Sequence, residues 1–176
     1  SLSAPIVSIV ASCDRETVTT IERAAALAER LHHPAVLPIH CFAAALGTSH
    51  GAALFGRLSS DIAGLKTRIE HVLGRITPFD RVVTTDDAVI TALASAYVHA
   101  ARARQRSVQV IDLLVALTTP EGAVRDCLDD LGITQQQIAN TATWLRAIDA
   151  LRSRYRRYHA RGALRKKGGM NRAMTA

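Results

Sequence analysis

Residues 22–47 read ERAAALAERLHHPAVLPIHCFAAALG, and residues 90–118 read ITALASAYVHAARARQRSVQVIDLLVALT. In each stretch, apolar residues with helical spacing lead through a short loop into a second apolar run. Adding 72 to the residue number aligns the first stretch with the second, so the chain contains an internal repeat. The matched pairs include Ile21 and Leu93, Ala24 and Ala96, Ala28 and Ala100, Val36 and Val108, Ile39 and Ile111, and Ala44 and Ala116.

Each copy of the repeat predicts four helices. The offset rises to 73 in the second half of each copy, where Leu58 matches Leu131 and Leu65 matches Ile138. Strand patterns are confined to two short candidates, at 6–10 and 81–85. The fold class is therefore all-α, a pseudo-twofold tandem repeat of two four-helix units. The predicted helices lie near 17–32, 39–47, 51–58 and 61–75 in the first copy, and near 86–104, 110–117, 121–130 and 134–150 in the second.

These patterns divide the chain into three parts. Residues 1–16 form an N-terminal extension, residues 17–150 form the double repeat, and residues 151–176 form a basic linker. The linker begins as a continuation of the last helix and becomes flexible where glycines accumulate. Within the double repeat, copy one covers 17–75, a connector covers 76–85, and copy two covers 86–150.

Composition and charge narrow the class of protein. A chain of 176 residues with 48% hydrophobic and 21% charged residues is typical of one globular domain. No apolar run approaches the roughly 20 residues of a membrane span, so no membrane partner is expected. Residues 149–172 hold nine of the 22 Lys and Arg residues and one of the 15 acids. The net charge of +7 therefore reflects a basic tail on a nearly neutral body.

The chain lacks the motifs of a catalytic or metal-binding domain. It contains no phosphate-binding loop, nucleophile elbow, HExxH or GxGxxG pattern, so we expect a non-catalytic chain without a cofactor. No His or Cys spacing predicts a metal site. His32 and His33 complement a helix C-terminus, and His40 makes a partly buried hydrogen bond. The three scattered cysteines are interpreted as buried structural thiols.

The two quoted stretches resemble the Clp N-terminal repeat, which occurs twice at the front of the AAA+ unfoldases and disaggregases. His40 matches the family histidine, and Asp112 stands in its place in copy two. The resemblance implies a cytoplasmic domain that docks misfolded protein clients or an adaptor and passes them to an ATPase ring. It further implies that ATP binds only in the following domains, that the parent protein is a homo-oligomeric ring, and that the isolated domain is monomeric.

The candidate client- or adaptor-binding residues are the apolar starts of the short helices. They occupy positions where a polar N-cap is usual. Two interpretations remain open: these residues are buried between the copies, or they form an apolar groove for hydrophobic segments. Of the two equivalent isoleucines, we expect Ile39 to be more exposed than Ile111. The candidates are Val36, Leu37, Pro38 and Ile39 in copy one, and Val108, Val110 and Ile111 in copy two.

The alternative function is a free-standing helical module that binds nucleic acid through its basic tail. Arginines interleaved with Tyr155 and Tyr158 are suited to stacking on single-stranded nucleic acid. No nucleic-acid fold signature accompanies them, so nucleic acid is not the expected partner. The salt dependence of binding distinguishes the two functions. Binding to nucleic-acid phosphates weakens steeply as the salt concentration increases, whereas capture of apolar clients should change little.

Overall fold

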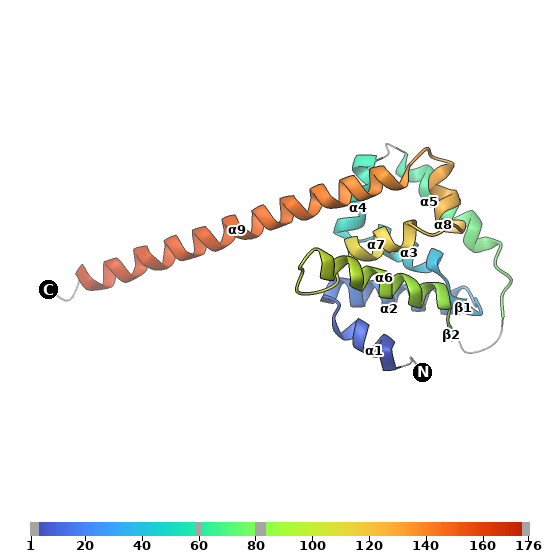
Figure 1. Ribbon diagram of the computed structural model, residues 1–176, viewed down its shortest axis with the longest axis horizontal. Coiled ribbons are helices and arrows are strands. Elements are labelled where there is room, and N and C mark those ends of the chain that lie inside the picture. The colour runs from blue at the N-terminus through green and yellow to red at the C-terminus, as the bar shows by residue number, and fades with distance from the viewer. Residues whose placement is uncertain (1–3, 59–60, 80–83, 174–176) are drawn as a thin grey trace. The chain divides into compact units, whose positions relative to one another are not determined.

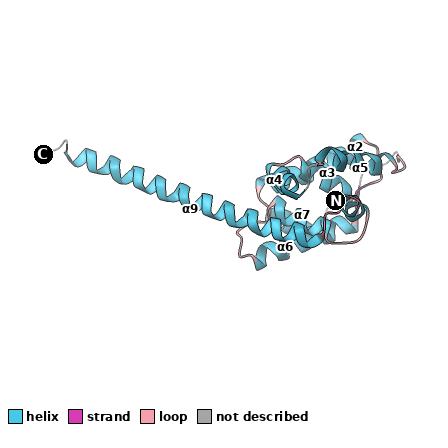
Figure 2. Cartoon of the chain, turned by 90° about the horizontal axis from the view of Figure 1, so that it is seen from above, coloured by secondary structure: helices cyan, strands magenta, loops and turns pink. Residues whose placement is uncertain are grey.

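The computed structural model describes residues 4–58, 61–79 and 84–173 of the chain (Figure 1). Its described elements are nine α-helices and two strands of two residues each, so helix dominates the fold (Figure 2). The predicted all-α class is confirmed. The chain separates into two compact units, Ser1–Ala142 and Thr143–Ala176.

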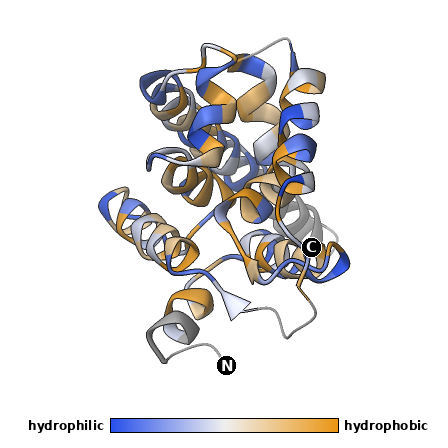
Figure 3. Cartoon of the chain, turned by 90° about the vertical axis from the view of Figure 1, so that its right-hand side faces the viewer, coloured by the Kyte–Doolittle hydropathy of each residue, from blue (hydrophilic) through white to orange (hydrophobic). Residues whose placement is uncertain are grey.

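The two repeats contain the same four kinds of helix in the same order, which confirms the predicted tandem repeat. A further helix, α1, precedes copy one. Hydrophobic and hydrophilic residues alternate along these helices, as amphipathic packing requires (Figure 3). The elements are α1 (Ala4–Ala11), α2 (Arg15–Arg30), β1 (Ala35–Val36), α3 (Pro38–Leu46), α4 (Ser49–Leu58) and α5 (Ile62–Gly74), then β2 (Thr84–Thr85), α6 (Asp87–Arg102), α7 (Val110–Thr118), α8 (Ala123–Asp129) and α9 (Gln135–Ala173).

Backbone pairing between the copies obeys the twofold relation. Strands β1 and β2 pair in parallel, with Val36 opposite Thr85. Their equivalents in the repeat, Val108 and Cys13, form a parallel bridge of their own. In both cases, the segment after the long first helix of one copy pairs with the segment before the long first helix of the other copy.

The turn after each long helix is also repeated. His32 and Arg104, which occupy equivalent positions in the two copies, have positive φ values of 55° and 53°. This left-handed conformation ends α2 and α6, even though neither residue is glycine. His32 was expected to complement a helix C-terminus. It instead forms the left-handed turn that follows α2.

The core is centred on the short helices α3 and α7, which contact each other. Nearly all of α7 and more than half of α3 are buried. A short helix that is apolar on all sides is stable only when other helices cover it, and α3 contacts every helix from α4 to α8 as well as α2. Phe42 on α3 packs edge-on against Phe55 on α4, with ring centroids 5.4 Å apart.

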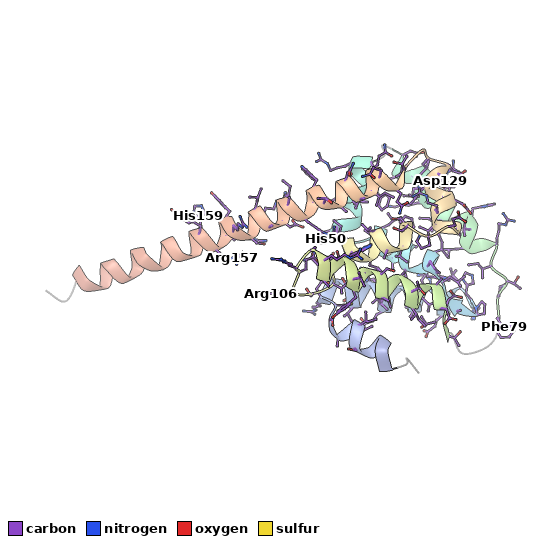
Figure 4. All side chains as sticks on the ribbon, in the orientation of Figure 1. His50, Phe79, Arg106, Asp129, Arg157 and His159 are labelled. Atoms are coloured by element: carbon purple, nitrogen blue, oxygen red, sulfur yellow. The ribbon has the colours of Figure 1, made fainter. Side chains whose placement is uncertain are left out.

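Arg125 on α8 is a buried cation that ties three segments together. Its Nε donates to Oδ1 of Asp129 at 2.9 Å, and its Nη1 donates to the carbonyl of Thr118 at 3.4 Å. Its Nη2 donates to the carbonyl of Ile133. The guanidinium therefore joins α8 to the end of α7 and to the loop before α9 (Figure 4 labels Asp129).

Of the two strand candidates, one differs from the sequence-based expectation. Residues 6–10, a strand candidate, belong to helix α1, which contacts α6. The apolar run IVSIV fits either structure, because a short apolar run does not reveal its period. Of the other strand candidate, residues 81–83 lie outside the described residues, and Thr84 and Thr85 form β2.

The last helix is longer than expected. The sequence predicted a helix near 134–150 that continues and then ends among glycines, whereas α9 runs to Ala173. No proline follows Pro120, and the tail is rich in Ala, Leu, Arg and Lys, which are strong helix formers. Each glycine costs only about 1 kcal/mol in a helix. The flexibility of this segment and the predicted domain limits stay predictions.

Candidate functional site

One apolar cavity of about 330 Å³ opens where the two repeats meet. Residues of α3 from copy one face residues of α6 and α8 from copy two across it. Glu121 is its one charged lining residue. The lining residues are Leu37, Pro38 and Ile39 at the start of α3; Val72 and Ile76 at the end of α5; Ala88 and Ala92 on α6; and Leu117, Pro120, Glu121, Gly122, Ala123 and Val124 from the end of α7 into α8.

Local sequence explains why this space is hollow. Ala88 and Ala92 present only methyl groups from the first two turns of α6. Gly122 has a φ of 138°, which side chains rarely adopt, and it turns the chain between α7 and α8. Pro38 begins α3 at a position where its missing N–H costs nothing. Small residues on one wall and a tight turn on the other leave an opening lined by carbon atoms.

The structure divides the predicted site residues into two groups. Leu37, Pro38 and Ile39 line the cavity, with Leu37 and Pro38 half-buried. Val36 is buried in β1, outside the lining. The three candidates from copy two, Val108, Val110 and Ile111, are buried in the core and do not line it.

Ile39 is more exposed than Ile111, as expected, but the difference is small. Ile39 is 3% exposed and Ile111 is 1% exposed, so both isoleucines are buried. Pro38 supplies the rigid first turn, but α3 lies in the centre of the fold and its second residue faces inward. Ile39 borders the cavity as part of its wall, whereas Ile111 does not line this cavity.

Val108 is held by the segment before α2. Its carbonyl accepts hydrogen bonds from the backbone N–H of Asp14 at 2.9 Å and from Oγ1 of Thr17 at 3.2 Å. In copy one, the equivalent carbonyl of Val36 accepts from the N–H of Asp86 at 3.1 Å. Val108 therefore closes the contact between the two copies.

The twofold counterpart of the cavity is polar. Ala88, Ala92 and Pro120 correspond to Glu16, Thr20 and Thr48 in copy one. The carboxylate of Glu16 contacts two neighbouring side chains. Its Oε1 accepts a hydrogen bond from Oγ of Ser49 at 3.1 Å, and its Oε2 lies 2.8 Å from Nδ1 of His50. The fold thus offers two equivalent positions, and only the one between α3, α6 and α8 is lined by apolar groups.

Sequence reasoning missed most of this lining. Ala88, Ala92, Pro120 and Val124 drew no attention, because alanine and proline carry no chemical signal of their own. The available signal was the comparison of the two copies, in which charged or hydroxyl-bearing residues of copy one become apolar at three matched positions.

Two buried histidines, His33 and His40, contact each other at the start of α3. Nδ1 of His33 and Nε2 of His40 are 2.7 Å apart, and Nδ1 of His40 accepts the backbone N–H of Leu37 at 2.9 Å. His40 therefore carries its proton on Nε2 and donates it to His33. Burial, and secondarily the neighbouring His33, lowers the pKa of His40 to about 4, and burial lowers the pKa of His33.

The expected role of His40 as a hydrogen-bonding residue is confirmed, and its burial is complete. His33, expected to complement a helix C-terminus, is instead buried and pairs with His40. In copy two, Asp112 takes the equivalent place, and its Oδ2 accepts the N–H of Gln109 at 2.9 Å. Each copy thus caps its short helix with the side chain at the third helical position.

The histidine pair predicts loss of stability in mild acid. Because the folded state lowers both pKa values below the unfolded value of 6.5, stability is complete above pH 6.5 and falls as the pH decreases toward 4. Each histidine contributes a slope of up to about 1.4 kcal/mol per pH unit. Urea unfolding between these pH values measures the slope. His40→Asn retains an acceptor for Leu37 and should reduce the slope; an unchanged slope would contradict this assignment.

The three cysteines are free thiols with low reactivity. Burial raises the pKa of Cys41 to about 12 and that of Cys13 to about 11, and it also raises the pKa of Cys127. Cys41 and Cys127 are buried, as expected, whereas Cys13 is half-buried.

Within the described ranges, no group of three His, Cys, Asp or Glu side chains could hold a metal ion. No described helix is both long and apolar enough to cross a membrane.

Comparisons with known proteins agree with this architecture. Residues 14–131 match the family model described as the Clp repeat (R) N-terminal domain. The fold is similar to the Hsp104 N-terminal domain from Candida albicans, with 19% identity and a TM-score of 0.71 over 77% of this chain and 91% of that chain. No curated protein matches the chain.

Two further solved structures are similar. The N-terminal domain of the ClpV1 ATPase from E. coli EAEC Sci1 T6SS has 20% identity and a TM-score of 0.68, over 81% of this chain and 91% of that chain. A complex of the ClpV N-domain with a VipB peptide has 14% identity and a TM-score of 0.54, over 78% of this chain and 87% of that chain. At these identities the structural likeness concerns the fold alone.

Proposed function

Because this chain belongs to the Clp N-terminal repeat family, we propose that it is the recognition domain of an ATP-dependent Clp chaperone and binds peptide segments in the cavity between its repeats. The observation that carries the proposal is the apolar lining contributed by both copies. The occupant is an exposed apolar segment of a misfolded client or of an adaptor. The domain itself is non-catalytic and hands its cargo to an AAA+ ring.

The cavity has the chemistry for this task. Its volume of about 330 Å³ lies at the small end of ligand pockets, so it suits a few apolar side chains rather than a folded surface. Burying apolar side chains gives about 25 cal/mol per Å² and requires no matched polar groups. Binding should therefore tolerate many sequences and be reversible, which a domain that captures varied clients requires.

The rim of the cavity is exposed to solvent, so the backbone of a bound segment can keep its hydrogen bonds to water there. Glu121 and Pro120 are exposed beside the apolar wall, and Ala88 is exposed at the start of α6. An extended peptide can place alternate side chains in the cavity and keep the others in water. The peptide in the similar ClpV N-domain complex supports a peptide as the class of ligand.

Filling the cavity tests this function. Ala88→Phe places a ring over the opening from an exposed position, so the domain should still fold. We expect it to weaken binding of a fluorescein-labelled peptide rich in leucine and phenylalanine at least tenfold, or about 1.4 kcal/mol. Fluorescence anisotropy measures the affinity. Ala101→Phe is the matched control, because Ala101 is exposed on the same helix and lies outside the lining.

Salt and sequence controls separate this proposal from its rival. Binding of the apolar peptide should change little with salt, and a serine-substituted peptide should not bind. Equal affinity of the wild type and Ala88→Phe for the apolar peptide would refute the cavity as the site. Tight, strongly salt-dependent binding of an oligothymidylate by the full chain would favour the nucleic-acid function instead.

A further inference from the structure

Helix α9 carries a narrow apolar seam in the unit Thr143–Ala176. Ile148, Leu151, Tyr155 and Tyr158 follow one another at spacings of three, four and three residues, which places them on one face of the helix. Leu151 is 59% exposed, Tyr155 is 66% exposed and Tyr158 is 78% exposed. Large apolar side chains repeated at this period are typical of a helix that pairs with another helix.

Arginines border the seam on both sides. Arg152 and Arg154 occupy the two positions that flank the seam in a heptad, and Arg156 and Arg157 follow on the outer face. A shallow hollow on the helix is lined by Leu151, Arg152, Tyr155 and Arg156, so apolar and cationic groups form one continuous surface. Asp149, at the start of the seam, lies 3.8 Å from Arg152, whereas positions 150–158 contain no acid.

The charge pattern determines what can cover the seam. Two copies of α9 would bring arginines together at their flanking positions, and like charges at these positions oppose pairing. A membrane surface would need a broad apolar face, but here the positions beside the seam are arginines. A nucleic acid would use the arginines and tyrosines but leave Ile148 and Leu151 without an apolar partner.

We propose that α9 pairs through Ile148, Leu151, Tyr155 and Tyr158 with an amphipathic helix of a partner protein that carries glutamate or aspartate beside its own apolar seam. The aliphatic side chains and the tyrosine rings interdigitate with apolar residues of the partner. The tyrosine hydroxyls lie at the ends of the rings, where they can donate to carboxylates. The planar guanidinium groups of Arg152 and Arg154 can each form two parallel hydrogen bonds to such a carboxylate, which a lysine ammonium group cannot do.

This surface uses residues other than those that line the cavity, so it stands independently of the proposed function. Figure 4 labels Arg157 and His159 on α9. The ring centroids of His159 and Tyr155 are 4.2 Å apart, and Nε of Arg157 donates to the carbonyl of Ser153 at 3.2 Å. Arg157 is bonded back to its own helix on the side away from the seam, which makes it a suitable control position.

A synthetic helix tests the proposal directly. The probe is a fluorescein-labelled peptide of several heptads, with leucine at both seam positions and glutamate at both flanking positions. It is titrated with the full chain, and anisotropy reports binding. Leu151→Gln and Tyr155→Gln both introduce a good helix former, so α9 should stay helical. Each should weaken binding at least about tenfold. Circular dichroism confirms that α9 stays helical in each variant.

Charge reversal separates specific pairing from general attraction. Arg154→Glu should weaken binding several-fold more than Arg157→Glu, although both change the net charge equally. A version of the probe with lysine in place of glutamate should not bind. Equal binding of the two probes, or equal effects of the two arginine variants, would overturn the proposal.

The other possible occupants provide further decisive outcomes. If sedimentation shows a dimer of the wild-type chain that Tyr155→Gln dissociates, then a second copy covers the seam and the proposal fails. Tighter binding to phosphatidylserine-containing vesicles, or to oligothymidylate, than to the acidic probe would also overturn it.

Discussion

Replacing Ile111 by glutamate is expected to destabilise the domain by about 4 kcal/mol or more, a large part of a typical domain stability of about 5–15 kcal/mol. Ile111 lies near the start of α7, is 1% exposed and does not line the cavity between the repeats. A carboxylate at this position would lose its water and gain no cationic partner among the apolar residues of α7. Urea unfolding followed by circular dichroism measures the effect.

The equivalent change in copy one should cost less. Ile39 occupies the matching position in α3 but borders the cavity, so the new carboxylate of Ile39→Glu can keep part of its hydration. If Ile111→Glu does not fold, Ile111→Val remains measurable, at a cost of about 1 kcal/mol. Equal stability of Ile111→Glu and the wild type would show that α7 is not the centre of the core.

Replacing Arg125 by methionine is the second change with a large expected effect, a loss of about 2–5 kcal/mol. Methionine keeps the apolar stem of the side chain but removes every donor. The carbonyls of Thr118 and Ile133 then lose the hydrogen bonds that Arg125 donates. Leaving buried acceptors unpaired costs about 1–3 kcal/mol each.

An exposed arginine provides the matched control. Arg68 on α5 pairs with Asp130, and both side chains are substantially exposed. Because exposed ion pairs contribute about 0–1 kcal/mol, Arg68→Met should be nearly neutral. Thermal unfolding of the two variants under the same conditions gives the comparison. Equal losses in Arg68→Met and Arg125→Met would contradict the role assigned to the buried guanidinium.

Much of the fold follows from local patterns in the sequence. The constant offset between matched residues predicted a repeated helix–turn–helix, and the structure repeats even the left-handed residues His32 and Arg104 at this offset. Asp61, just before α5, caps that helix through its side chain, which accepts the N–H of Gly64 at 2.7 Å. These features depend on residues within a few positions of one another, so periodicity and capping rules reach them.

The candidate site was only partly predictable. Leu37, Pro38 and Ile39, three of the residues predicted from the apolar start of α3, line the cavity, and their role in binding stays a prediction. Val110 and Ile111, the equivalents of Pro38 and Ile39 in copy two, are apolar as well, yet they are buried in the core and do not line the cavity. Residue type could not distinguish the two cases, because accessibility depends on what the opposite helix presents.

The sequence by itself determined the class of fold, the repeat, the order of helices and the location of the basic charge. All of these rest on short-range periodicity, on composition and on turn residues. Only the tertiary structure showed that the matched residues line two equivalent clefts, of which the one between α3, α6 and α8 is apolar. Ala88, Ala92 and Pro120 are small or lack donors, whereas Glu16, Thr20 and Thr48 in the matching cleft are polar, and Glu16 contacts Ser49 and His50. A cavity forms where side chains that are far apart in the sequence do not fill the space between packed helices, so it exists only once the helices have packed.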